Sequence, residues 1–261
     1  MEAYTGFAGV YDMFMDNIPY KEWGEYLCGL LQEYQVTDGI VVDMGCGTGG
    51  ITEQLALAGY DMIGIDNSEE MLSIARDKKS DYTKEDSRNQ ILYLLQDMRE
   101  LELYGTAKAM VSICDSMNYL LGEEDLLTVF RLVNNYLDAK GVFIFDLNTE
   151  YKYKELLGEQ TIAENREDAS FIWENFYYPD EQVNEYDLTI YVKEEEDLYR
   201  RFSETHYQQC YSLETVKRLL EEAGMEFVTA YDAFTNEPPR EDSERIYIIA
   251  REGHQEKKFY V

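Results

Sequence analysis

VVDMGCGTGG, residues Val41 to Gly50, joins a short β-branched run to a glycine-rich turn. A turn of this kind between a strand and a helix lets the backbone approach a ligand closely and presents amide groups at a helix N-terminus. Gly45, Gly47 and Gly50 fit the spacing G-x-G-x-x-G, which usually indicates a dinucleotide. Asp43 stands two positions before the first of these glycines. The ligand of this turn must therefore tolerate both a nearby carboxylate and a close approach of the backbone.

Around this turn, short apolar runs alternate with runs of helical periodicity. The pattern predicts strands over residues 39–45, 61–66, 90–97, 107–115 and 142–148, with helices over 49–60, 67–79 and 123–141 between them. A further helix is predicted over 212–225, followed by two strands over 227–234 and 245–251. Strands that alternate with helices imply a parallel sheet with right-handed crossovers. The expected fold is α/β, a doubly wound Rossmann-like sheet that is mostly parallel and carries an antiparallel hairpin at its C-terminal edge.

The pattern changes between the fifth and sixth of these strands. Aromatic-rich runs over 169–178, 184–195 and 199–211 alternate in character and lack helical period. We expect residues 150–207 to form an inserted antiparallel β subdomain, and residues 1–149 and 208–261 to form the Rossmann-like domain with an N-terminal helical cover. The insertion follows the fifth strand, so it should lie over the carboxyl ends of the strands, where open α/β sheets bind ligands. It is either a lid or a dimerisation and core-covering subdomain.

Composition excludes several classes of function. The net charge is −30, from 53 acidic and 23 basic residues, and a field of that sign repels a phosphate backbone. Neither a run of about 20 apolar residues nor a secretory signal pattern is found, so we expect a cytoplasmic protein without a membrane partner. Four cysteines without a C-x-x-C pair, and only two histidines, His206 and His254, indicate no disulfide framework and no metal site. They also disfavour a hydrolytic triad.

Charge discriminates between the ligands that a glycine turn usually binds. Asp66 ends the second predicted strand, where an acid takes the hydroxyls of a ribose in NAD proteins too. The pyrophosphate of NAD would lie near Asp43, at a cost of about 3 kcal/mol for charges ~5 Å apart at an effective dielectric of 20. S-adenosylmethionine has no phosphate and carries an ammonium and a sulfonium. The sequence therefore favours S-adenosyl-L-methionine over NAD.

These residues resemble the first motif of the class I S-adenosylmethionine-dependent methyltransferases, D-x-G-C-G-T-G, which stands here as Asp43 to Gly49. The resemblance continues in GIDNSEEML, LQDMREL and ICDSMNYL, and together these motifs cover about residues 34–148. A looser resemblance, carried by YDMFMDNIPYKEW, the aromatic insertion and HYQQCYSLETVKRLLEEAGM, is to a bacterial subgroup that acts on small molecules. That subgroup includes amino-sugar and glycine N-methyltransferases.

The resemblance implies a set of roles for single residues. Asp43 would receive the methionyl amine, Asp66 the ribose, and Asp97 the adenine amino group. Cys46 has no partner that would make it a nucleophile and is expected to be a packing residue of the turn. The full set of expected cofactor contacts is Tyr11, Trp23, Asp43, Gly45, Cys46, Gly47, Gly49, Asp66, Asn67, Asp97, Met98, Cys114 and Asp115.

The N-terminal helical segment of related enzymes folds over the cofactor. Tyr11 and Trp23 would then either contact the sulfonium by cation–π attraction or serve as core aromatics. Three residues are candidates for catalysis at the acceptor: Tyr11, Asp115 and His206. His206 lies in an alternating strand, so it is either an acceptor-site base or a structural residue.

The expected function is methyl transfer to an N or O atom of a small-molecule acceptor by a monomer or homodimer. Methyl transfer requires little acid–base apparatus, because the sulfonium is already activated and proximity carries most of the rate enhancement. Two alternatives stay open. One is an RNA methyltransferase, which the charge disfavours, and the other is a non-catalytic S-adenosylmethionine-binding regulatory module.

Overall fold

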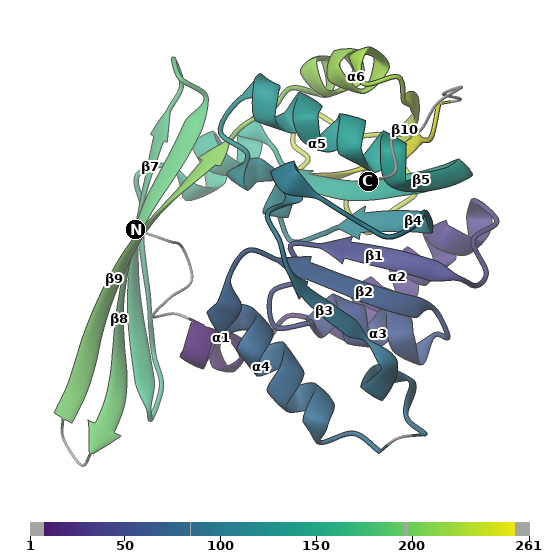
Figure 1. The fold of residues 1–261 in the computed structure, drawn as a ribbon. Coiled ribbons are helices and arrows are strands. Elements are labelled where there is room, and N and C mark those ends of the chain that lie inside the picture. The colour runs from purple at the N-terminus through teal and green to yellow at the C-terminus, as the bar shows by residue number, and fades with distance from the viewer. Residues whose placement is uncertain (1–7, 84, 196–197, 254–261) are drawn as a thin grey trace.

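The computed structural model describes residues 8–83, 85–195 and 198–253, so His254 lies outside the described residues. Its main body is a seven-stranded sheet with the order β10-β11-β5-β4-β1-β2-β3 (Figure 1). The strands are β1 Ile40–Met44, β2 Asp61–Asp66, β3 Leu92–Leu95, β4 Ala107–Ser112, β5 Leu137–Asn148, β10 Glu226–Asp232 and β11 Arg245–Arg251. β11 runs antiparallel to both β5 and β10, and the other neighbouring strands pair in parallel. The predicted doubly wound sheet with an antiparallel C-terminal hairpin is confirmed.

Helices cover both faces of this sheet. One face packs against α5 Glu123–Tyr136 and α6 Leu213–Glu222, and the other against α2 Tyr20–Glu33, α3 Gly50–Leu57 and α4 Glu69–Ser80. The Ser68 hydroxyl caps α4 by accepting a bond from the Met71 amide at 3.2 Å. Acidic residues fill its first turn and lysines its last, which complements the helix dipole.

The predicted third helix is too long. α5 ends at Tyr136, and β5 begins at the next residue with a polar bend in which Lys140 has φ +65°. A Cβ on Gly141 would lie 2.9 Å from the carbonyl oxygen of Asp138, so the bend requires glycine at that position. The apolar stripe of α5 ends before this bend, because residues 138–140 turn outward and are at least partly exposed while the strand from Gly141 onward is buried.

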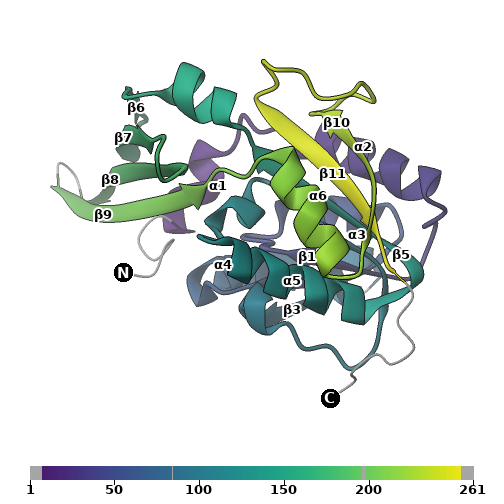
Figure 2. The ribbon, with the colours of Figure 1, turned by 90° about the horizontal axis from the view of Figure 1, so that it is seen from above.

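The insertion folds as a separate four-stranded antiparallel sheet with the order β6-β7-β8-β9 (Figures 1 and 2). Its strands are β6 Thr161–Asn165, β7 Ala169–Tyr178, β8 Val183–Glu195 and β9 Leu198–Gln209. The last three match the predicted aromatic runs. β6 and a preceding π-helical turn, Lys152–Leu157, were not predicted, because each is too short to show a clear period.

The N-terminal helix α1, Ala8–Phe14, connects the two sheets and packs between the inserted sheet and α4 (Figure 1). The Phe14 ring meets Phe171 of β7 edge to face with centroids 4.9 Å apart. Towards the main body, Asp12 accepts a bond from the Thr48 hydroxyl at 2.5 Å and pairs with Lys78 at 3.1 Å. The glycine turn and the inserted sheet are thus linked through one short helix. No described helix is long and apolar enough to span a bilayer.

Two buried amides stabilise the inserted sheet. Asn175 and Asn184 exchange hydrogen bonds of 3.0 and 2.9 Å, and their side chains are 1% and 0% exposed. We expect Asn184→Ala to lower the free energy of unfolding by about 1–3 kcal/mol, because the buried Asn175 amide oxygen loses its donor while the amide nitrogen keeps only the Gly158 carbonyl. Urea unfolding followed by tryptophan fluorescence measures this, since Trp173 lies in the same sheet. The control is Ser203→Ala on the exposed face, and equal stability of the two variants would contradict the prediction.

Candidate cofactor and acceptor site

A cavity of about 520 Å³ opens where β1, β2 and β4 end, at the edge expected from the topology. This volume is within the range of small-molecule sites. Residues that the sequence predicts as cofactor contacts form much of its wall: Tyr11, Asp43, Gly45, Cys46, Gly47, Asp66, Asn67, Asp97, Met98 and Cys114. The wall also includes residues that sequence reasoning missed, among them Tyr20, Thr48, Arg99, Ser116 and Tyr119.

The glycine turn takes a conformation that explains its spacing. Gly45, Gly47 and Gly49 have φ values of +75°, +55° and +85°, in the left-handed region that glycine favours. A Cβ on Gly45 would lie 2.5 Å from the Ser116 hydroxyl oxygen, and one on Gly49 would lie 2.4 Å from the Tyr93 hydroxyl oxygen. Gly50 begins α3 instead. The backbone of the turn therefore requires Gly45, Gly47 and Gly49, the glycines of the D-x-G-C-G-T-G motif. Gly50, the third glycine of the G-x-G-x-x-G spacing, is not required by the backbone.

Asp43 is buried at the base of this turn, with 2% of its surface exposed. One carboxylate oxygen accepts a hydrogen bond from the Thr52 hydroxyl at 2.6 Å. Burial raises the pKa of Asp43 to about 7, and the charge of Asp66 adds to this, while the Thr52 bond opposes it. A cation on the cavity side would favour the ionised form of this carboxylate.

Asp66 connects the second strand to the glycine turn. Its carboxylate accepts hydrogen bonds from the amides of Gly47 and Ser68, both at 2.8 Å. Burial raises the pKa of Asp66, and the backbone bonds oppose that rise. Because both ends of the carboxylate are held by backbone amides, its position against the cavity depends on the turn itself.

The third strand ends two residues earlier than predicted, at Leu95, and Asp97 caps the short turn Met98–Glu100 instead. The Arg99 amide donates to Asp97 at 2.8 Å and the guanidinium forms further bonds to the same carboxylate. The Arg99 hydrogen bond holds the pKa of Asp97 below its usual value. Arg99 also pairs with Asp125 at 3.2 Å, so this cation on the cavity wall is already neutralised by two acids.

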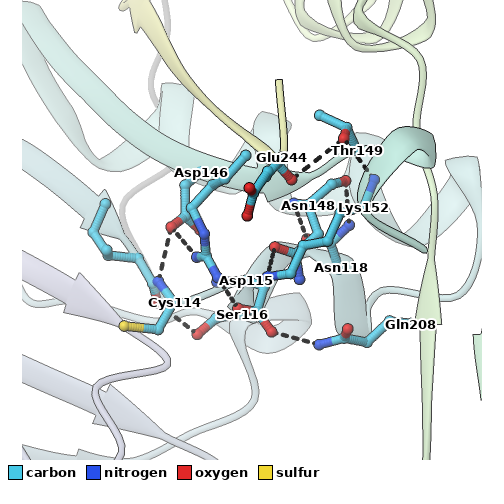
Figure 3. Close-up of polar contacts among 12 residues, drawn as sticks. Cys114, Asp115, Ser116, Asn118, Asp146, Asn148, Thr149, Lys152, Gln208 and Glu244 are labelled. Carbon is cyan, nitrogen blue, oxygen red and sulfur yellow. Dashed lines mark hydrogen bonds and ion pairs between the residues drawn. The ribbon is translucent and has the colours of Figure 1, made fainter. Parts of the chain in front are cut away.

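The turn after β4 is strained. Cys114 and Asp115 have φ values of +64° and +57°, which are unfavourable for residues with a Cβ. The buried Asp146 carboxylate of β5 holds this turn by accepting from the Cys114 amide at 3.1 Å and the Asp115 amide at 2.7 Å (Figure 3). Cys114 lines the cavity, and burial raises the pKa of its thiol.

Asp115 is not among the residues that line the cavity. Its carboxylate pairs with Arg245 at 2.6 Å and accepts a bond of 2.6 Å from the Gln208 side chain of β9 (Figure 3). Arg245 also pairs with Asp146. Burial alone would lower the pKa of Arg245, but Asp146 and Asp115 hold it well above its usual value. Asp115 thus belongs to an ion-paired joint between the two sheets.

The two predicted N-terminal aromatics lie in different places. Tyr11 of α1 lines the cavity, as does Tyr20 at the start of α2. Trp23 is not among the lining residues; its ring lies edge to face with that of Tyr20, at a centroid distance of 6.2 Å, and stacks on Phe234 with ring centroids 5.0 Å apart. The Arg245 guanidinium lies 6.0 Å from the Trp23 ring centroid. Trp23 therefore has the core-aromatic position that the sequence left open.

Comparison with known proteins identifies the family. YqeM of Bacillus subtilis (strain 168), which carries a provisional name as a methyltransferase, is 37% identical over 251 residues, 96% of this chain and 97% of the relative. Residues 41–141 match the model of a family described as a methyltransferase domain. The chain is a class I S-adenosylmethionine-dependent methyltransferase. The predicted family, enzyme class and cofactor are confirmed, and the NAD interpretation is excluded.

Solved structures share the whole architecture of this methyltransferase. A crystal structure of an S-adenosylmethionine-dependent methyltransferase from Clostridium acetobutylicum superposes with a TM-score of 0.83 and 27% identity, covering 97% of this chain and 100% of the other. The sugar N-methyltransferase KedS8 from Streptoalloteichus sp. superposes with a TM-score of 0.75 and 17% identity, covering 94% and 93%. The second likeness establishes the fold alone.

The cavity of the methyltransferase fits its cofactor. Two carboxylates, Asp43 and Asp66, line the cavity, which suits a group that carries an ammonium and a sulfonium, and the glycine turn would let the backbone lie against such a group. A group of His, Cys, Asp and Glu side chains able to hold a metal ion is not found among the described residues.

His206, the remaining catalytic candidate, is buried in β9 with 2% of its surface exposed. It does not line the cavity, but its Nδ1 lies 3.2 Å from the hydroxyl of Tyr119, which does. Tyr119 ends a short 3₁₀ turn, Ser116–Tyr119, that follows β4. The structure therefore brings the insertion and the cofactor cavity together through one tyrosine.

The raised pKa of Asp43 predicts how stability depends on pH in the ligand-free protein. The unfolded chain releases this proton near pH 3.8 and the folded chain near pH 7, so between these values the folded state holds one proton more. Stability from this group therefore falls as pH rises through that window. We expect Asp43→Asn to flatten the decline in the free energy of urea unfolding between about pH 4 and pH 7, the window in which the folded chain holds the extra proton. Asp61→Asn, at the exposed start of β2, is the control, and equal slopes in all three proteins would contradict the prediction.

Proposed function

We propose that this methyltransferase acts on an N or O atom of a small-molecule acceptor that binds between the cofactor cavity and the inner face of the inserted sheet. The observation that supports this most directly is the contact between Tyr119, on the cavity wall, and His206 of the insertion. His206 does not line the cavity itself, so the insertion supports this part of the cavity wall through Tyr119. The fold shared with a sugar N-methyltransferase is consistent with a small acceptor.

The cofactor is proposed to bind with its methionyl amine at Asp43, its ribose at Asp66, and its adenine between Asp97 and Met98. Each of these residues lines the cavity. S-adenosylmethionine supplies a methyl group on a sulfonium, which is already a good electrophile. The protein contributes orientation and the exclusion of water, and proximity of this kind supplies a large part of the rate enhancement in two-substrate reactions.

The net charge of −30 weighs against an RNA acceptor and in favour of a cationic one. Amines that are protonated at neutral pH would be attracted to this protein, although they must lose a proton before they attack a methyl group. The inner side of the insertion adds aromatic rings, with Trp173 and Tyr186 centroids 4.8 Å apart, which suit a cationic ligand.

Turnover to S-adenosylhomocysteine with matched acceptors tests this proposal. We expect methylation of amines such as glycine or glucosamine. Glycolate and glucose, the hydroxyl analogues of these amines, and transfer RNA, the nucleic-acid alternative, are assayed beside them. Methyl transfer to RNA alone would overturn the proposal. Binding of S-adenosylmethionine without turnover in a metabolite extract would instead favour a regulatory module.

Asp66 provides a test of the cofactor assignment. We expect Asp66→Asn to weaken S-adenosylmethionine binding by ~1.5–3 kcal/mol, because the amide loses charge-assisted bonds to the ribose. Calorimetric titration measures the affinity, and circular dichroism verifies that the fold is retained. Asp61→Asn, at the other end of the same strand, should bind like the wild type. Unchanged affinity in Asp66→Asn would show that the second strand does not hold the ribose.

A further inference from the structure

The inner face of β9 carries three polar side chains in a row. Glu204, His206 and Gln208 alternate with outward residues, and all three are buried, with 4%, 2% and 3% of their surface exposed. Gln208 bonds to Asp115 and so belongs to the joint between the sheets. Glu204 and His206 lie farther along the strand and form a different network. Burying ionisable groups is costly unless they are paired and hydrogen-bonded. The partners of Glu204 and His206 therefore decide how this burial is stabilised.

The network is a continuous chain from the interior of the insertion to the cofactor cavity. The Glu204 carboxylate lies 3.2 Å from His206 Nε2, and His206 Nδ1 lies 3.2 Å from the Tyr119 hydroxyl. Tyr119 lines the cavity. The ionisable groups that contact His206 include Glu204 from its own strand, Tyr119 from the turn after β4 and Tyr186 from β8.

Tyr186 fixes the orientation of the imidazole. The two rings stack with centroids 4.8 Å apart and planes inclined by 8°, and the Tyr186 hydroxyl also bonds to that of Tyr119. A neutral imidazole has one donor nitrogen and one acceptor nitrogen. Because a carboxylate can only accept, Nε2 carries the proton towards Glu204 and Nδ1 is left to accept from the Tyr119 hydroxyl.

We propose that Tyr119, His206 and Glu204 form a proton relay that deprotonates an amine acceptor, an assignment that rests on the proposed function. Tyr119 is the catalytic residue, and His206 and Glu204 act through it. The N–H bond of the bound ammonium breaks as its proton passes to the Tyr119 oxygen, while the Tyr119 proton passes to His206 Nδ1. The products are a neutral amine with a free lone pair and an imidazolium, which the Glu204 carboxylate stabilises. The relay returns to its starting state when the imidazolium releases its proton to solvent.

An amine is the acceptor class that this relay suits. An alkylammonium has a pKa of about 8–10, so a side-chain base can remove its proton near pH 7. An aliphatic hydroxyl is a far weaker acid and would require a much stronger base. The relay also accounts for the burial of Glu204, because a carboxylate away from water stabilises an imidazolium more strongly than an exposed one does.

The tautomer of His206 tests the relay without an acceptor. The chain has only two histidines, so His254→Gln leaves His206 as the single imidazole for nitrogen NMR. We expect the proton on Nε2, and a changed Nδ1 resonance when Tyr119→Phe is added. A proton on Nδ1 would overturn the proposal, because that nitrogen could not accept from Tyr119.

Kinetics on the best amine from the acceptor screen provides the second test. We expect Tyr119→Phe, His206→Gln and Glu204→Gln to lower kcat, with His206→Gln about 10²-fold or more below wild type near pH 7. S-adenosylmethionine affinity should not change in the His206 and Glu204 variants. The deficit should shrink as the pH approaches the pKa of the amine itself, since the free base no longer needs the relay. A deficit that is the same at every pH would indicate a structural role and overturn the proposal.

The matched control is Tyr207→Phe, which removes a hydroxyl from the next residue of β9 on the exposed face of the sheet and should leave kcat unchanged. Failure of the proposed function would look different from failure of the relay. If the proposed function fails, the wild-type protein will bind S-adenosylmethionine and methylate none of the amines, whichever nitrogen of His206 carries the proton.

Discussion

The buried carboxylate of Asp43 beneath the glycine turn is the constraint on which the rest of the site depends. Its burial raises its pKa to about 7, so in the ligand-free protein its charge is unfavourable at neutral pH. A ligand that brings positive charge relieves this cost, whereas a pyrophosphate would add to it. Thr52 ties this carboxylate to the helix that follows, and Asp66 holds the turn through the Gly47 amide, so the charge preference and the shape of the turn are set together.

The joint between the two sheets rests on a second group of charges. The buried Asp146 and the partly buried Arg245 and Asp115 form an ion-paired set that holds two residues of the turn after β4 in the left-handed region. Replacing such a set by apolar groups is often neutral for stability. The role of these charges is therefore to fix the conformation of the turn, and not to stabilise the fold. The set holds Cys114 against the cavity and, through Gln208, fixes where β9 meets the Rossmann-like domain.

This joint determines what the insertion does at the site. With Gln208 held on Asp115, the alternation of β9 directs His206 and Glu204 to the same inner face, and Tyr119 meets them from the turn after β4. Helix α1 closes the remaining side through Asp12 on the glycine turn and Phe14 on β7. The cofactor cavity and the proposed acceptor space are therefore parts of one packed unit, and a change in the position of the insertion would alter both.

The sequence by itself determined the succession of strands and helices along the chain, the glycine turn and the acidic residues near the ends of β1 and β2. These features are encoded locally, in hydrophobic period, in left-handed glycines and in residues adjacent along the chain. Only the tertiary structure decided that Trp23 stacks on Phe234, that Asp115 pairs with Arg245 130 positions later, and that Tyr119 meets His206. Such contacts join segments that are far apart in the chain, and no local pattern records them. They follow from how the inserted sheet packs, which depends on the burial of many side chains at once.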